Sequence, residues 1–174
     1  GSMSSSRGLT TLSDGTLILT FSEAINYTRF GNREGVKYVA RSTDHGYTWT
    51  GLTTPITPPQ PFLQMFDAGG RILETSDGTL LMPFWGSRSL DPNWAVSPMG
   101  SESVVLRSFD GGVTWPDMRV VAFDANVPPL AAGYGGTYTI AMGPTEFDVR
   151  QMPDGRIVAL LRTDSVTDPL KKKQ

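Results

Sequence analysis

Apolar residues in this chain occur in short runs that glycine, proline and polar residues separate. The runs TLILTF (16–21), VKYVA (36–40), TLLMPF (79–84) and SVVLR (103–107) have the length of β-strands. The 19 glycines and 13 prolines divide the chain at strand-length spacing, and no window shows a helical period. The pattern therefore predicts an all-β protein.

An Asp-Gly pair divides two apolar runs at three places, which is a strong signal for a β-hairpin. In the third copy Pro153 precedes the pair, presets the first turn residue and leaves the positive φ to glycine. We expect a three-residue loop in every copy. Because the runs 16–21 and 79–84 are apolar on nearly every residue, these hairpins should be covered on both faces. The three pairs are Asp14-Gly15, Asp77-Gly78 and Asp154-Gly155.

A second element, Ser-x-Asp-x-Gly-x-Thr-Trp, occurs as STDHGYTW (42–49) and SFDGGVTW (108–115). Its serine and aspartate can hydrogen-bond to their own turn, its glycine can adopt a positive φ, and its tryptophan can pack over the hairpin. We therefore expect a fold-forming turn, with a catalytic or metal-binding role of Asp44 and Asp110 as the weaker alternative. His45, the single histidine, occupies a variable slot and should be exposed.

The two elements alternate with a period of about 65 residues, which is typical of four-stranded β-propeller blades. Asp-Gly turns recur after 63 and 77 residues, and the octapeptide recurs after 66. The sequence predicts one domain, 4–174, forming a partial β-propeller of about 2.5 blades (about 6–58, 66–124 and 136–170). Residues 1–3 are typical of a cloning remnant.

A third octapeptide aspartate would fall near position 186, beyond Gln174, if the 30 and 33 residues between turn and octapeptide were repeated. Propellers close with about four to eight blades, and closure protects their strand edges. We expect the chain to be either part of a longer protein or one of several copies that complete one another. Both alternatives predict an exposed apolar face and self-association.

Each Asp-Gly pair closes a hairpin, and we expect a site at the end of that hairpin opposite the turn. Counting outward from the pair Met152–Arg156 places Glu146 directly opposite Arg162, which predicts a charge-assisted ion pair. An ion pair in one repeat alone marks a candidate catalytic site, and a structural salt bridge is the alternative. The same count opposes Trp85 to Gly69 and Ser22 to Ser6 in the other repeats.

Further candidates for substrate binding lie at the matching end of the second repeat and before the third. Tyr134 and Tyr138, in the glycine-rich segment GYGGTY, could stack on a sugar, or the segment could be a plain connection between blades. Arg7 is a weaker candidate. The substrate-binding candidates are Arg71, Arg88, Asp67 and Tyr138.

Composition excludes several other function classes. The net charge is −2 and no long basic stretch occurs, so the sequence shows no positively charged surface for binding nucleic acid or an anionic membrane. Without cysteine there is no disulfide, thiolate metal site or cysteine nucleophile, and His45 alone cannot build a zinc site. No spaced set of carboxylates suggests calcium, no cofactor is expected, and no apolar run approaches the length of a membrane span.

The octapeptides resemble the Asp-box, or BNR, repeats of the sialidase (neuraminidase) superfamily of six-bladed propellers, over nearly the whole chain. The stretch EFDVRQMPDGRIVALLRTD (146–164) is similar to a sialidase stretch in which a glutamate precedes the hairpin and an arginine follows it. The resemblance implies that Glu146 supports the catalytic tyrosine and that Arg162 is one of three arginines gripping the substrate carboxylate. It implies an exo-sialidase or related glycosyl hydrolase with a carbohydrate substrate, and favours a secreted or periplasmic location.

The chain also departs from the sialidase pattern. Where a sialidase has Phe-Ala-Glu-x-Arg and then an acid/base aspartate, this chain has FSEAI (21–25) and no aspartate before Asp44, so Ile25 fills the slot of the second arginine. Arg7-Gly8-Leu9 is the best match to the first-arginine motif, and the blades with the third arginine and the tyrosine nucleophile are not in this sequence. We therefore expect no cleavage of sialic acid by this chain alone. A non-enzymatic propeller module that binds glycan or protein, and an inactive self-assembling fragment, are the alternatives.

Overall fold

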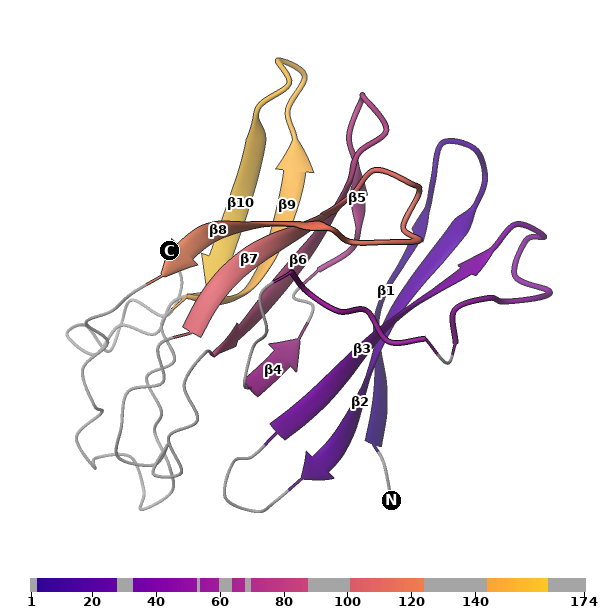
Figure 1. Cartoon of the computed structure of the whole chain (residues 1–174). Helices are drawn as coiled ribbons and strands as arrows, with labels where there is room; N and C mark the ends of the chain where they lie inside the picture. Colours follow the sequence, from indigo (N-terminus) through magenta and orange to yellow (C-terminus); the bar gives the residue numbers. More distant parts are fainter. Residues whose placement is uncertain are drawn as a thin grey trace.

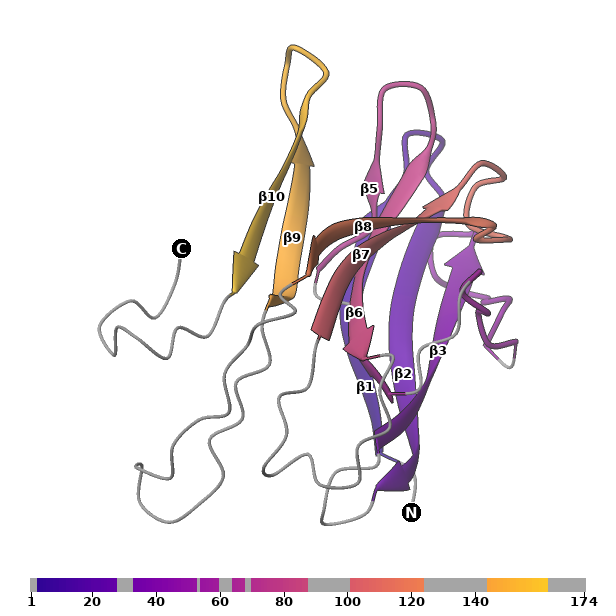
Figure 2. The ribbon, with the colours of Figure 1, turned by 60° about the vertical axis from the view of Figure 1, so that its left-hand side comes forward.

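The computed structural model of the chain describes residues 3–27, 33–52, 54–59, 64–67, 70–87, 101–123 and 144–162. Regular structure in these ranges is entirely β-strand, which confirms the all-β fold class. The strands form three antiparallel sheets, none of which closes on itself. The sheets lie side by side in the order of the sequence, with their Asp-Gly turns at the same end (Figures 1 and 2).

The first sheet has the order β1-β2-β3, the second the order β4-β6-β7-β8 with β5 also paired to β6, and the third the pair β9-β10. The second sheet has all four strand positions of the expected unit. β4 and β5 both pair with β6 and together occupy the first of these positions. In the first sheet, isolated bridges at Thr50 and Pro55 take the place of a fourth strand. The strands are β1 (Met3–Thr11), β2 (Leu17–Tyr27), β3 (Arg33–Ser42), β4 (Gln64–Asp67), β5 (Leu73–Glu74), β6 (Leu80–Ser87), β7 (Ser101–Ser108), β8 (Asp117–Phe123), β9 (Thr145–Gln151) and β10 (Ile157–Arg162).

The three Asp-Gly turns share one geometry. In the third, the backbone N–H of Met152 donates to the carbonyl of Arg156 at 2.8 Å, and the first and second turns repeat this bond at 2.8 and 2.9 Å. The glycine of each turn has a φ between 83° and 86°, which side chains rarely adopt. The prediction of three-residue loops is confirmed for all three copies.

The first octapeptide forms the turn that follows β3, and the second forms the turn between β7 and β8. Ser42 Oγ donates to Asp44 at 2.7 Å and accepts the N–H of Gly46 at 2.8 Å, while Asp44 accepts the N–H and the hydroxyl of Thr48 at 2.8 and 2.6 Å. The second octapeptide repeats these bonds through the matching residues Ser108, Asp110, Gly112 and Thr114. The fold-forming role is confirmed, and His45 is exposed as expected.

These hydrogen bonds favour the ionised form of both aspartates. The hydroxyl and N–H of Thr48, together with Ser42, lower the pKa of Asp44 from 3.8 to about 2. Burial acts to raise the pKa of Asp110, but the bonds from Thr114 and Ser108 outweigh it and lower that pKa to about 2 as well. Each carboxylate is committed to its own turn, which argues against a catalytic role.

Alternate faces of the strands pack against successive sheets. One buried cluster joins Ile18 and Val39 of the first sheet to Leu80 and Phe84 of the second. A second cluster joins the opposite face of the second sheet to the third. Residues 80–85 of β6 are buried throughout, so the predicted coverage of both faces is confirmed there, whereas Leu17 and Leu19 of β2 are only half-buried. The second cluster comprises Leu81, Val105, Phe147 and Val149.

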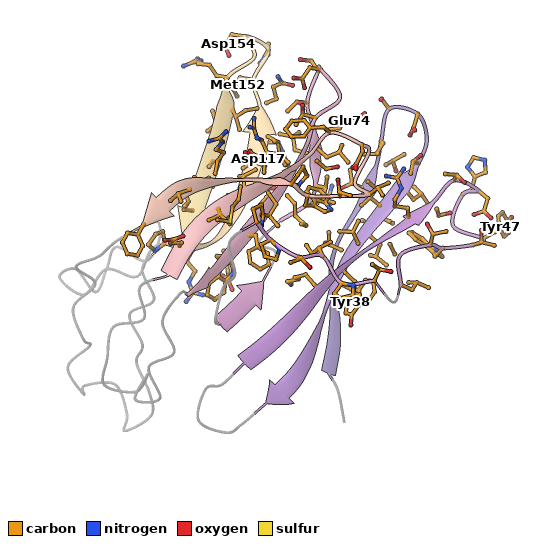
Figure 3. All side chains as sticks on the ribbon, in the orientation of Figure 1. Tyr38, Tyr47, Glu74, Asp117, Met152 and Asp154 are labelled. Atoms are coloured by element: carbon orange, nitrogen blue, oxygen red, sulfur yellow. The ribbon has the colours of Figure 1, made fainter. Side chains whose placement is uncertain are left out.

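Polar contacts also repeat between neighbouring sheets near the Asp-Gly turns. The N–H and hydroxyl of Ser13 donate to the Glu74 carboxylate at 2.6 and 2.8 Å. Gln151 binds Ser76 in the same way, accepting from its N–H at 2.9 Å and donating to its hydroxyl at 3.3 Å. Glu74 lies on the side of the second sheet that faces the first (Figure 3). The same positions therefore join the first repeat to the second and the second to the third.

Candidate functional site

The predicted ion pair forms at the end of the third sheet opposite its Asp-Gly turn. Glu146 lies near the start of β9, and Arg162 is the last residue of β10. Arg162 Nη1 is 3.2 Å from Glu146 Oε2 and donates a hydrogen bond to it. Two residues 16 positions apart are thus joined by the antiparallel pairing of one hairpin.

The exact register of this end was predicted wrongly. Arg162 pairs with Thr145, not with Glu146, because the ladder shifts by one residue between Leu161 and Arg162. A bulge places two residues of one strand opposite one residue of the other, and a count outward from the turn cannot foresee it. The arginine side chain is long enough to reach Glu146 despite the shift.

Register shifts also occur at the corresponding ends of the other two sheets. Ser22 pairs with Ser5 rather than Ser6, after a shift between Ser6 and Gly8. Trp85 pairs with Asp67 rather than Gly69, after the innermost strand is interrupted between β4 and β5. All three hairpins therefore change register at the end where the site was expected. Bulges of this kind redirect side chains and occur frequently next to active sites.

The ion pair is open to solvent. The side chains of Arg162 and Glu146 are 43% and 55% exposed. Exposed ion pairs contribute about 0–1 kcal/mol, so this pair adds little to the stability of the hairpin. Because the pair is open to solvent, the guanidinium can exchange Glu146 for another carboxylate.

The structure joins none of the remaining candidate residues to this ion pair among the side chains that it describes. Arg71 is exposed, beside Gly8 of the first sheet, and within the described ranges no hydrogen bond or ion pair links it to Glu146 or Arg162. Asp67 ends β4. Arg88 and Tyr138, together with Tyr134, lie outside the described residues, as do the side chains of Asp67 and Arg7.

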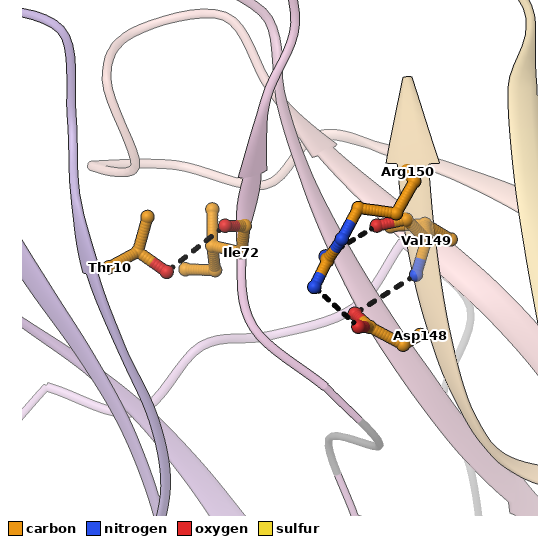
Figure 4. Close-up of polar contacts among 5 residues, drawn as sticks. All are labelled: Thr10, Ile72, Asp148, Val149 and Arg150. Carbon is orange, nitrogen blue, oxygen red and sulfur yellow. Dashed lines mark hydrogen bonds and ion pairs between the residues drawn. The ribbon is translucent and has the colours of Figure 1, made fainter. Parts of the chain in front are cut away.

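A second ion pair, which the sequence did not suggest, lies two residues further along β9. Arg150 Nη2 is 2.9 Å from Asp148 Oδ2, and Arg150 Nη1 donates to the carbonyl of Val149 (Figure 4). Asp148 also accepts the N–H of Val149 at 3.0 Å. The alternation of charge at 146, 148 and 150 places these side chains on one face of β9, and this alternation could have revealed the second pair.

A groove of about 500 Å³ lies between the first sheet and the second octapeptide. β3 and residues 50–51 and 54–57 line it on one side, and residues 112–115 line it on the other. Arg41 and Trp115 line it, and the buried atoms Arg41 Nη1 and Trp115 Nε1 find no hydrogen-bond partner among the described residues. Neither Glu146 nor Arg162 contributes to this groove, so it is separate from the ion pair.

No protein-family model and no curated protein matches the chain. Across the described residues, no three histidine, aspartate or glutamate side chains form a group that could hold a metal ion. In the same ranges, no helix is long and apolar enough to cross a membrane. The solvent-exposed pair of Glu146 and Arg162 remains the candidate site.

Proposed function

We propose that the three sheets are successive blades of an incomplete, sialidase-like β-propeller of about 2.5 blades. Three features of the described residues support this: identical Asp-Gly turns, identical octapeptide turns, and the repeated serine contact between neighbouring sheets. Side-by-side sheets with their turns at one end are the arrangement of propeller blades.

The chain would contribute to a site for glycans that carry a carboxylate, as part of a sialidase-like glycosyl hydrolase. The observation that carries this proposal is the exposed Glu146–Arg162 pair. The residues eight positions after each Asp-Gly aspartate are Ser22, Trp85 and Arg162, so a cation occupies this position in the third repeat alone. A guanidinium at the open end of a hairpin suits a sugar carboxylate, which it can bind with two parallel hydrogen bonds.

A non-enzymatic module that binds acidic glycan or protein is the second candidate. It is favoured by Ile25, where a second arginine would stand, and by the absence of an aspartate between Glu23 and Asp44. Arg162 would then bind the ligand, and no bond would be broken.

Turnover of a fluorogenic sialoside separates these candidates. Measurable turnover that Arg162→Ala abolishes and Arg156→Ala preserves would support the hydrolase, because Arg156 is an exposed arginine at the opposite end of the same hairpin. If the wild-type chain binds a sialoside without turning it over, the binding module is supported. If the chain neither binds nor cleaves the sialoside, both proposals fail for this chain.

A further inference from the structure

Among the described residues, apolar faces join neighbouring sheets twice, and one further face of the first sheet and one of the third have no described sheet packed on them. We call the face that packs on the preceding sheet the leading face and the opposite one the trailing face. The leading face is defined in the second sheet by Ile72, Leu80, Met82, Phe84 and Val104, and in the first by Leu9, Leu17, Leu19 and Phe21. The trailing face is defined by Ile18 and Val39 in the first sheet, Leu81 and Val105 in the second, and Val158 and Leu160 in the third.

One position shows how the leading face of the first sheet differs from those of the other two sheets. Leu9, Ile72 and Val149 each precede the aspartate of their Asp-Gly turn by five residues. Ile72 is 3% exposed and Val149 1%, because each packs on the preceding sheet, whereas Leu9 is 53% exposed. Phe21 and Tyr38 stack beside it, with ring centroids 4.9 Å apart. Among the described residues, Leu9 therefore presents an exposed apolar side chain at a position that is covered in the second and third sheets.

The trailing face of the third sheet shows the reverse. Val158 follows its aspartate by four residues, as Ile18 and Leu81 do, yet it is 48% exposed while they are 0% and 7% exposed. Leu160 is 71% exposed, whereas its counterpart Thr20 is 1% exposed. The described residues therefore expose apolar side chains of the leading face on the first sheet and of the trailing face on the third.

We propose that the trailing face of the third sheet binds the leading face of the first sheet of a second copy of this chain. A second copy is the partner because the contact would repeat, position by position, the two sheet-to-sheet contacts the chain already makes. The pairing is head-to-tail, so it leads either to a closed ring or to a growing row of copies.

The proposed contact between copies lacks the serine hydrogen bonds that join neighbouring sheets inside the chain. Pro153 stands where Ser13 and Ser76 donate a backbone N–H, and Thr11 stands where Glu74 and Gln151 accept one. Neither side leaves an unmatched partner. The association rests on apolar contact and is therefore reversible and dependent on concentration.

Sedimentation velocity of the wild type and of two charge variants tests the pairing. The wild type should gain mass with concentration. Leu9→Asp blocks the leading face and Leu160→Asp the trailing face, so each variant alone should be monomeric, with association weakened at least about ten-fold. An equimolar mixture should form a one-to-one dimer, because each variant supplies the face the other has lost. Val120→Asp, at an exposed position of β8 in the middle sheet, should associate like the wild type.

Several outcomes would overturn the proposal. A wild type that is monomeric throughout excludes the pairing, and so does a mixture of the two variants that stays monomeric. If only Leu160→Asp abolishes association, two copies meet through β10 in a symmetric contact instead.

Disulfide trapping provides a second test if an aspartate variant does not fold. The chain has no cysteine, so Leu9→Cys mixed with Val158→Cys should yield a disulfide-linked heterodimer. Preferential cross-linking of either cysteine variant with itself contradicts the head-to-tail pairing.

Discussion

The turn of the first sheet is fixed to the second through two hydrogen bonds, since Ser13 donates its backbone N–H and its hydroxyl to the Glu74 carboxylate at 2.6 and 2.8 Å. Ser76 and Gln151 occupy the same places between the second and third sheets. A glutamate and a glutamine both serve here, because the position requires an oxygen that accepts the backbone N–H.

Removing this acceptor should weaken the contact between the first two sheets. Glu74→Ala should lower the free energy of unfolding by about 1 kcal/mol, because the Ser13 N–H loses its partner. Glu74→Gln, which places in the first contact the side chain found in the second, should cost less than half as much. Urea unfolding followed by tryptophan fluorescence measures both, and equal losses would contradict the role of the acceptor oxygen.

The close approach of the second and third sheets at Gly70 should not tolerate a side chain. A Cβ at Gly70 would lie 2.7 Å from Asp148 Oδ1 and 3.0 Å from the carbonyl of Phe147. Gly70→Ala should therefore cost about 1–3 kcal/mol. Gly8→Ala is the matched control, because its nearest contact, Arg71 Cα, would be 3.3 Å away and the loss should be smaller. A reversed order of the two losses in thermal unfolding would show that the sheets do not meet as described.

The octapeptide aspartates should make stability depend on pH in the acid range. Their pKa values fall from 3.8 to about 2 in the folded chain, so their contribution is complete above the unfolded pKa and is lost as the pH falls through about 2. The double variant Asp44→Asn, Asp110→Asn should be less stable than the wild type at pH 7. Its melting temperature should also fall less between about pH 4 and pH 2. Parallel melting curves for the two proteins across this range would contradict the assignment.

His45 should be replaceable with a gain in stability. Its φ of 59° is in the left-handed region, and the second octapeptide has Gly111 at this position with a φ of 68°. His45→Gly should raise the free energy of unfolding by about 0.5–1 kcal/mol, because glycine adopts this conformation without steric cost. His45→Ala retains a Cβ and should show no such gain. A loss of stability in His45→Gly would indicate a contact made by the imidazole.

The local parts of this fold could be predicted from sequence, and the contacts between distant parts could not. Asp-Gly and octapeptide turns are set by residues within a few positions of one another, so Asp154 and Asp44 were sufficient to predict them. The ion pair of Glu146 and Arg162 was predictable because one hairpin joins them, but the bulge beside Arg162 depends on how the whole strand end packs. The contact of Ser13 with Glu74 and the groove between Arg41 and Trp115 join different repeats. Hydrophobic periodicity does not specify which residues of two neighbouring sheets meet.

Binding of a carboxylated sugar at Arg162 tests the central claim most directly. Saturation-transfer NMR with 3′-sialyllactose should show binding to the wild type, with a Kd of about 1 mM as expected for a single exposed cation. Arg162→Ala should abolish the signal and Arg156→Ala should retain it. Glu146→Gln should tighten binding several-fold, since it removes the carboxylate that competes for the guanidinium. Equal binding by the wild type and Arg162→Ala, or none by the wild type, would contradict the account.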